Sequence, residues 1–554
     1  MMAFALLQAA GLILTNGNIY TQDRARPRVE AVAIQADRVV YVGDDAGAAR
    51  FAGPGTRRID LKGATVVPGL IDAHGHVESL GHLDNQLDVK GTGSADEIAA
   101  SVAARAADLP AGRWILGRGW DQNDWKETSF PSRLSLDAAA PNHPVSLSRV
   151  DGHALWVNTA ALRAAGITKA TPDPAGGQII RDASGEPTGI LVDLAADLIE
   201  AKIPAPTRDE IRQALLAGMK RCLAAGLTGV HDAGVTQTTL ELYHELVVKG
   251  DFPFRVYAML AGEAAVADKP MAAGWLDRRL EMGPEIGLGG GRLTVRALKL
   301  YMDGALGSRG AALLAPYDDD PGNRGLLRTD PVLMRRLAER AARAGFQVCI
   351  HAIGDRGNRL ALDALEAAGH VDGAGGVGRP GGRHRIEHAQ VLAPEDLPRF
   401  AALGVVASMQ PTHATSDMYW VAERIGARRV AGSYAWKSLL DSGARLACGS
   451  DFPVESEAPL AGFYAAVTRQ DAKGWPEGGW TPSERLSREQ ALSCFTRDAA
   501  WAAFEEDQRG SIAPGKLADL TVLSADIMKI PAARILETNV LMTIVGGRVA
   551  YERK

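Results

Sequence analysis

A single pattern recurs through the middle of this 554-residue chain: a helical run ends at a glycine, and a short apolar run follows. The glycines that end these helical runs are Gly226, Gly345, Gly404 and Gly443. The runs after them are apolar at consecutive positions, whereas a strand with one face in water alternates apolar and polar residues. Strands buried on both faces are typical of parallel sheets that helices cover. The pattern therefore predicts an α/β fold with a parallel sheet.

The two ends of the chain differ from this middle region and resemble each other. Short β-rich runs separated by turn sequences cover residues 12–21, 29–43, 57–69, 510–524 and 539–552. A short sheet must bury its apolar side against a partner. We therefore expect residues 1–65 and 507–554 to form one small β-sandwich around the central region.

Metal-binding side chains stand where several of the predicted strands end. In parallel α/β folds the chemistry gathers at the carboxyl ends of the strands. The side chains found there are His74, His76, His351, His388 and Asp451. His74 and His76 are two residues apart on an extended run, so both can reach one ion. Imidazole nitrogen and carboxylate oxygen suit Zn²⁺, and Mn²⁺, Fe²⁺ and Co²⁺ are alternatives. Each residue alone is unremarkable in such a place, but together they indicate a metal site.

Lys299 lies within the predicted strand 293–303. Alternation places it on one face with Val295, Ala297 and Tyr301. An unpaired ammonium is costly to bury, so burial favours a neutral amine that can capture CO₂ and become a carbamate ligand bridging two metal ions. The alternative is a lysine that reaches water or pairs with Asp303.

Six motifs in this order resemble the amidohydrolase superfamily, and most closely amidohydrolase family 3, the YtcJ-like metal-dependent hydrolases. They are VPGLIDAHGH (67–76), KLYMDGALGSR (299–309), HAIGD (351–355), IEHAQ (386–390), MQPTH (409–413) and GSDFP (449–453). The run RGSIAPGKLADL (509–520) matches the superfamily's C-terminal return. The resemblance covers nearly the whole chain.

This resemblance implies a (β/α)₈ TIM-type barrel over residues 66–506, carrying the composite β-sandwich. It implies one or two divalent metal ions, Zn²⁺ first among them, held by His74 and His76 on the first strand, carbamylated Lys299 on the fourth, His351 on the fifth, His388 on the sixth and Asp451 on the eighth. The distance from His76 to His231 is long for two barrel strands. We therefore expect an insertion over about residues 80–206, which also contains the second barrel strand near 144–153.

The chemistry expected of such a site is hydrolysis. A bound metal makes hydroxide available near neutral pH, and Asp451 is the candidate catalytic residue that moves the proton from water to the leaving nitrogen. Candidate substrate-binding residues are Trp120, Asp121, His153, His231, Arg309 and His413, each of which has an alternative structural role. Arg309 could clamp a carboxylate and so favour acidic substrates. Trp125 is better explained as packing.

We expect cleavage of a carbon–nitrogen bond in a non-peptide amide, N-acyl or N-formyl small molecule. A dipeptidase, deacetylase or lactonase is the alternative within the superfamily, because the same nucleophile attacks peptide and ester carbonyls. A catalytically silent barrel with an assembly or regulatory role is the alternative of another class. Loss of a ligand residue would favour that alternative, and all are present.

Composition limits partners and location. With 61 Lys and Arg against 66 Asp and Glu and no basic block, the chain lacks the footprint of a nucleic-acid binder, and a homodimer is the commonest assembly. The cysteines, Cys222, Cys349, Cys448 and Cys494, form no CxxC pair, so we expect neither a disulfide framework nor a thiolate zinc site.

Residues 1–14 are apolar but too short to span a bilayer. A cytoplasmic location is expected, with export the alternative if residues 1–11 are a trimmed signal remnant. The glycine-rich run 372–384 is expected to be a flexible surface loop.

Overall fold

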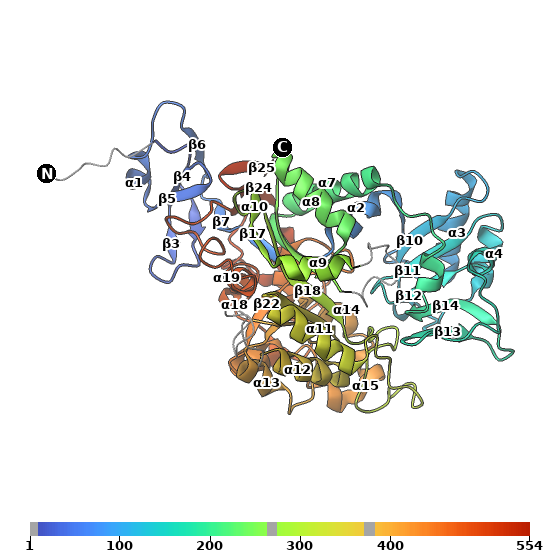
Figure 1. Ribbon diagram of the computed structural model, residues 1–554. Coiled ribbons are helices and arrows are strands. Elements are labelled where there is room, and N and C mark those ends of the chain that lie inside the picture. Colours follow the sequence, from blue (N-terminus) through green and yellow to red (C-terminus); the bar gives the residue numbers. More distant parts are fainter. Residues whose placement is uncertain (1–8, 263–273, 370–382) are drawn as a thin grey trace.

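The computed structural model describes residues 9–262, 274–369 and 383–554, and it contains a nearly closed barrel of eight parallel strands (Figure 1). In barrel order the strands are β8 (Leu70–Gly75), β15 (Leu227–Val235), β16 (Arg255–Ala261), β18 (Leu293–Tyr301), β19 (Gln347–Ala352), β20 (Arg385–His388), β21 (Val406–Met409) and β22 (Arg445–Cys448). A parallel bridge between Gly75 and Phe452 brings the last segment back to the first strand. The predicted α/β barrel is confirmed.

Helices cover the outer face of this barrel. The main ones are α7 (Arg208–Ala224), α8 (Gln237–Lys249), α11 (Pro331–Arg343), α12 (Asp355–Gly369), α13 (Leu397–Leu403) and α16 (Trp436–Asp441). Helix α7 begins at a capping box in which Thr207 and Glu210 satisfy each other's backbone N–H groups. Gly226, Gly345, Gly404 and Gly443 all have positive φ, between 64° and 93°, which lets the chain leave each helix and enter the next strand.

Both ends of the chain contribute to one sandwich. Its first sheet has the order β5 (Arg38–Gly43), β4 (Ala31–Gln35), β1 (Leu12–Thr15) and β6 (Arg57–Asp60). Its second sheet has the order β25 (Arg548–Glu552), β24 (Val540–Val545), β23 (Leu520–Leu523), β7 (Thr65–Pro68), β2 (Asn18–Tyr20) and β3 (Arg28–Val29). Leu14 and Val32 from the first sheet share a core with Val66, Val522 and Ile544 from the second. Strand β7 leads almost directly into barrel strand β8.

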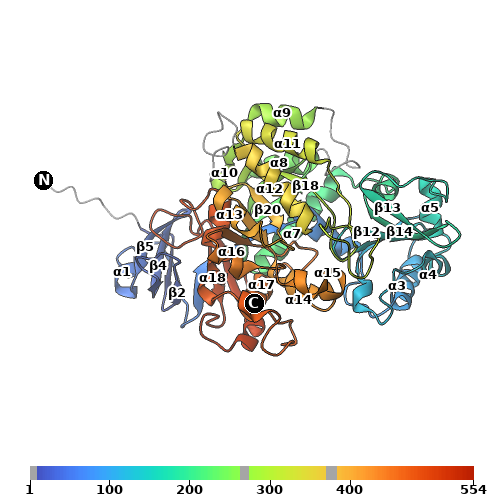
Figure 2. The same ribbon diagram turned by 90° about the horizontal axis from the view of Figure 1, so that it is seen from below.

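An insertion follows the first barrel strand and forms a separate six-stranded sheet. The order is β13 (Gly177–Arg181), β14 (Pro187–Asp193), β12 (Ala154–Val157), β11 (Val145–Arg149), β10 (Ile115–Trp120) and β9 (Leu87–Asp88), with helices α3 (Ala95–Ala107), α4 (Arg133–Ala139) and α5 (Thr159–Ala165) beside it. Strands β9, β10 and β11 run parallel. Figures 1 and 2 show this insertion and the N-terminal sheet on opposite sides of the barrel.

The prediction that the second barrel strand lies near residues 144–153 is wrong. Those residues contain β11 of the insertion, and β15, which carries His231, pairs with β8 instead. The physical reason is that an apolar run ending in polar residues has the same sequence pattern in any parallel sheet. His231 therefore belongs to the second barrel strand.

The remaining elements connect these parts. They are α1 (Asp45–Ala49), α2 (Val77–His82), α6 (Asp197–Glu200), α9 (Trp275–Met282), β17 (Glu285–Gly287), α10 (Leu288–Gly291), α14 (Pro411–Asp417), α15 (Val421–Val430), α17 (Pro459–Thr468), α18 (Arg488–Cys494) and α19 (Arg497–Ala502). No helix in the described part of the chain combines the length and apolarity that a membrane crossing requires. Most of the glycine-rich run 372–384 lies outside the described residues.

Two local expectations need correction. Cys448 at the end of β22 and Cys494 at the end of α18 form a disulfide, although 46 residues separate them. The spacing of Cys448 and Cys494 along the chain does not predict that they lie close together, because they meet only when α18 packs against the barrel. Alternation in β18 also breaks, because the register between β16 and β18 shifts beside Arg296. Val295 therefore packs toward the helices, whereas Ala297 lies in the barrel interior.

Candidate active site

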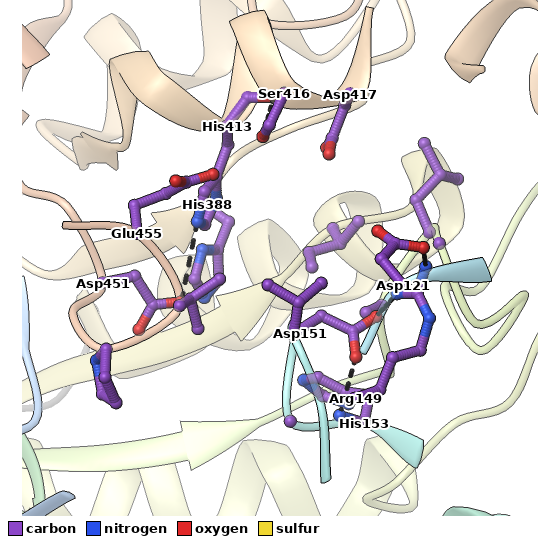
Figure 3. Close-up of a pocket in the computed structure, with 18 of the residues that line it drawn as sticks. Asp121, Arg149, Asp151, His153, His388, His413, Ser416, Asp417, Asp451 and Glu455 are labelled. Atoms are coloured by element: carbon purple, nitrogen blue, oxygen red, sulfur yellow. Dashed lines mark hydrogen bonds and ion pairs between the residues drawn. The ribbon is translucent and has the colours of Figure 1, made fainter. Parts of the chain in front are cut away.

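A cavity of about 330 Å³ lies at the carboxyl ends of the barrel strands, between the barrel and the insertion. Figure 3 shows His388, His413 and Asp451 on one side of it and Asp121, Arg149 and Asp151 across from them. The predicted site residues that line it are His74, His76, Asp121, His153, Lys299, His351, His388, His413 and Asp451. The topology thus brings together side chains from distant parts of the sequence.

Asp451 is at the centre of the barrel side. Its Oδ1 lies 2.9 Å from Nε2 of His76 and 3.5 Å from Nε2 of His74. The backbone N–H of Asp451 donates to the carbonyl of His74 at 2.7 Å, which joins the end of β22 to β8. Nζ of Lys299 lies 3.5 Å from Nε2 of His74 and above the ring of Tyr301. Lys299 therefore faces the histidines, and its predicted alternative contact with Asp303 is not formed in the described structure.

Three of the histidines are oriented by acceptors on their Nδ1 side. These pairs are His74 with Glu387 (2.5 Å), His76 with the carbonyl of Ala233 (2.8 Å) and His388 with Oε1 of Gln410 (2.9 Å). A ring that donates its Nδ1–H keeps the Nε2 lone pair for a ligand. The sequence pattern does not predict these acceptors, although Glu387 directly precedes His388 in the IEHAQ motif.

The charge of Glu387 is stabilised by a buried arginine. Burial would raise the pKa of this carboxyl, but Arg385 and His74 hold it well below its usual value. Arg385 forms an ion pair with Glu387 at 2.7 Å and also contacts Nδ1 of His231 at 2.8 Å. His231 thus belongs to the packed barrel interior beneath the cavity and does not line it.

The histidines are held in the form that binds metal. Burial lowers the pKa of His74 to about 4, and it lowers the pKa of His351 and of His388 well below the usual value. Burial would raise the pKa of Asp451, but His74 and His76 keep it well below its usual value. The site therefore combines neutral imidazoles with a carboxylate at neutral pH.

This donor set fits a divalent cation. The potential ligand atoms of His74, His76 and Asp451 lie within 4.8 Å of one another, as do those of His388, His413 and Asp451. Nδ1 of His76 donates to a carbonyl, so in the neutral ring Nε2 carries a lone pair that faces Oδ1 of Asp451 at 2.9 Å. Nε2 and Oδ1 are then both acceptors, and a cation or a proton must lie between them. Nε2 of His351 is buried with no hydrogen-bond partner in the described structure.

The insertion supplies the opposite wall from the ends of β10 and β11. Arg149 is buried between two carboxylates, Asp121 and Asp151. Nδ1 of His153 donates to Asp193 at 2.7 Å, which leaves its Nε2 for the cavity. Sequence reasoning missed Arg118, Arg149 and Asp151, although the run RVDGH at 149–153 includes the end of a predicted strand, as the barrel ligands do.

Two further candidates lie outside the lining of the cavity. Trp120 is fully buried, packs against Trp125 and Trp156, and donates its indole N–H to the carbonyl of Leu147. Arg309 pairs with Asp319 at 2.8 Å. The packing explanation for Trp125 also agrees with its burial in this cluster.

Comparison with known proteins identifies the family. The model of the amidohydrolase family matches residues 57–551. YtcJ of Bacillus subtilis is 35% identical over 97% of this chain and 98% of its own length, and the N-substituted formamide deformylase of Arthrobacter pascens is 30% identical over 99% of each. The crystal structure of an uncharacterized metal-dependent hydrolase from Pyrococcus horikoshii has a TM-score of 0.73 and 29% identity, covering 94% of this chain and 99% of that one. The chain therefore belongs to the amidohydrolase family of metal-dependent hydrolases and is an enzyme that hydrolyses carbon–nitrogen bonds.

Proposed function

We propose that this enzyme cleaves the carbon–nitrogen bond of a non-peptide amide, an N-acyl or an N-formyl small molecule. The observation that carries the proposal is the convergence of histidine and carboxylate ligand atoms around Asp451 at the barrel mouth. The similarity to a protein named N-substituted formamide deformylase supports this class of substrate. The cavity of about 330 Å³ suits a small substrate.

One or two divalent cations, with Zn²⁺ as the first candidate, are proposed to bind at one set of side chains. The proposed ligands are His74, His76, Lys299 as its carbamate, His351, His388 and Asp451. A cation there supplies polarisation of the substrate carbonyl and a lower pKa for water. Conversion of the Lys299 amine and CO₂ to a carbamate releases one proton and gives this side chain one negative charge that two oxygens share. Lys299 is buried, and its Nζ lies 3.5 Å from Nε2 of His74, so a carbamate on this side chain would stand among the other proposed ligands.

Asp451 is the proposed proton carrier. Its carboxylate is ionised at neutral pH, so it can accept a proton from the attacking water. It then returns that proton to the leaving nitrogen. His74, His76 and the backbone bond to His74 hold Asp451 in place in the lining of the cavity.

His153 is the proposed stabiliser of the oxyanion. Its Nδ1–H is fixed by Asp193, so its ring is held in one orientation with Nε2 on the cavity side. Asp121 and His413 are proposed to contact the substrate because they also line the cavity. Trp120, His231 and Arg309 take no part in this proposal, because their contacts lie elsewhere.

Elemental analysis and a substrate panel test the proposal. We expect bound divalent metal, loss of activity on chelation and recovery when metal is returned. The panel contains N-formyl, N-acyl, dipeptide and lactone compounds, and we expect turnover of the first two groups. His388→Ala should lower metal content, whereas His143→Gln, which changes a histidine on the insertion away from the cavity, should not. Preferential turnover of dipeptides or lactones, or a protein that binds no divalent metal and hydrolyses none of these compounds even after metal is added, would contradict the proposal.

A further inference from the structure

Three arginines line the insertion side of the cavity, and their charges are balanced differently. Arg149 pairs with Asp121 and Asp151, and Nη1 of Arg328 lies 3.6 Å from Asp193. Arg118 has no carboxylate within ion-pair distance among the residues that the structure describes. Its Nη2 donates to the backbone carbonyl of Val150 at 2.7 Å, and a neutral carbonyl does not cancel the guanidinium charge.

A β-bulge directs this side chain toward the cavity. The register between β10 and β11 shifts between Arg118 and Trp120, which makes Gly119 the extra residue. In a regular strand without a bulge, Arg118 and Trp120 are two residues apart and would share one face of the sheet. The bulge instead puts Trp120 into the aromatic core and leaves Arg118 on the opposite face, where it lines both the catalytic cavity and a neighbouring cavity of about 870 Å³.

The bulge depends on glycine. Gly119 has φ of 111°, and a Cβ there would lie 2.8 Å from the backbone nitrogen of Lys90. A larger residue is strained both by the backbone conformation and by this contact. The local backbone is thus specialised to hold Arg118 in its present direction.

The electrostatics agree with this geometry. Burial lowers the pKa of Arg118, and Asp451 is the first of the carboxylates whose charge opposes that effect. The guanidinium is therefore partly buried, has no ion-pair partner among the described residues, and lies within electrostatic range of the proposed catalytic carboxylate. A guanidinium in such a place binds carboxylates through charge-assisted hydrogen bonds.

We propose that Arg118 binds a carboxylate of the substrate, so that the enzyme prefers N-acyl and N-formyl compounds that carry a carboxylate close to the scissile amide. This inference rests on the proposed function and names its substrate class. It assigns to Arg118 the role that the sequence analysis gave to Arg309, which pairs with Asp319 outside the cavity lining.

The test compares N-acetylglycine with its neutral amide, N-acetylglycinamide. We expect the wild-type enzyme to have the higher kcat/KM for the acid. Arg118→Gln should lower kcat/KM for the acid about 10- to 100-fold, mainly through KM, and change that for the amide less than about 3-fold, because only the acid loses a charged hydrogen bond. Arg118→Lys should recover part of the preference. The control is Arg105→Gln, an exposed arginine on α3 of the same insertion, which should leave both values unchanged.

A binding measurement separates this inference from the proposed function. Calorimetry with the Asp451→Asn protein reports binding of N-acetylglycine without turnover. Binding that Arg118→Gln weakens supports the carboxylate site even if neither compound is hydrolysed. Equal binding of acid and amide, or an equal loss for both in Arg118→Gln, would overturn the inference and make Arg118 a structural support of the Val150 backbone.

Discussion

The cavity lies between two edges of parallel strands that differ in chemistry. The barrel edge presents histidines that burial keeps neutral, with their Nδ1 atoms bonded to buried acceptors. The insertion edge presents Arg149, which pairs with Asp121 and Asp151, and Arg118, which has no ion-pair partner among the described residues. Neutral nitrogen donors suit metal binding, whereas fixed charges suit recognition of a charged ligand. The carboxyl ends of parallel strands therefore supply the reactive groups on the barrel side of the cavity and, as we propose, selectivity for the substrate on the insertion side.

The largest expected effect comes from the barrel edge. Asp451→Asn keeps the shape of the side chain but removes the proposed proton carrier, so kcat should fall about 10²- to 10⁴-fold. Steady-state kinetics measure this, with metal content determined on the same sample. The control is Asp441→Asn, an exposed carboxylate on α16 that pairs with Lys437. An Asp451→Asn protein with normal metal content and near wild-type kcat would show that the barrel edge does not supply the proton carrier through Asp451.

The second effect concerns the stability of the insertion edge. Arg149→Met leaves Asp121 and Asp151 beside an uncharged side chain in a buried place, and breaking such a network costs about 3–5 kcal/mol. Chemical denaturation followed by tryptophan fluorescence measures it, since Trp120, Trp125 and Trp156 pack in this insertion. Arg181→Met breaks a more exposed pair with Asp173 in the same sheet and should cost less than about 1 kcal/mol. Equal losses in the two variants would show that burial of Arg149 does not matter.

The smallest effect tests whether burial alone keeps a barrel histidine neutral away from the cavity. Burial lowers the pKa of His384 to about 4, and its Nδ1 accepts the N–H of Val348. With an unfolded pKa of about 6.5, the unfolded chain binds more protons between these values, so this contribution to stability is present above about pH 6.5 and is lost as pH falls toward 4.

His384→Asn removes this titration but keeps an acceptor. Between pH 7.5 and pH 5 the wild type should lose about 2 kcal/mol more unfolding free energy than the variant. Denaturant titrations of both proteins at the two pH values measure the difference. An identical pH dependence would mean that His384 is already protonated, or exposed to water, in the folded protein.

The sequence predicted the barrel edge well because its signal is local. An apolar run lies next to each of four residues, His74, His351, His388 and Asp451. Because the strand–helix pattern repeats along the chain, it predicts parallel strands whose carboxyl ends lie together. The resemblance to a known family then predicted which barrel strand carries each residue. The observed strand order agrees for Lys299, which lies on β18, the fourth strand of the barrel.

The insertion edge was harder to predict because its arrangement depends on contacts between distant segments. The direction of Arg118 follows from one extra residue, Gly119, and simple alternation cannot reveal a bulge. Trp120 was a candidate for the cavity for the same reason. The position of Arg309 depends on Asp319, ten residues further on, and no local pattern shows that pairing.

The pairing of β7 with β23 has a consequence for synthesis. Residues 65–68 hydrogen-bond to residues 520–523, and β7 continues into the strand that carries His74 and His76. Translation proceeds from the N-terminus, so the ribosome makes the first two proposed ligands more than 400 residues before their anchoring strand β23 (Leu520–Leu523). A nascent polypeptide that already contains every proposed ligand still lacks the segment that fixes the first two.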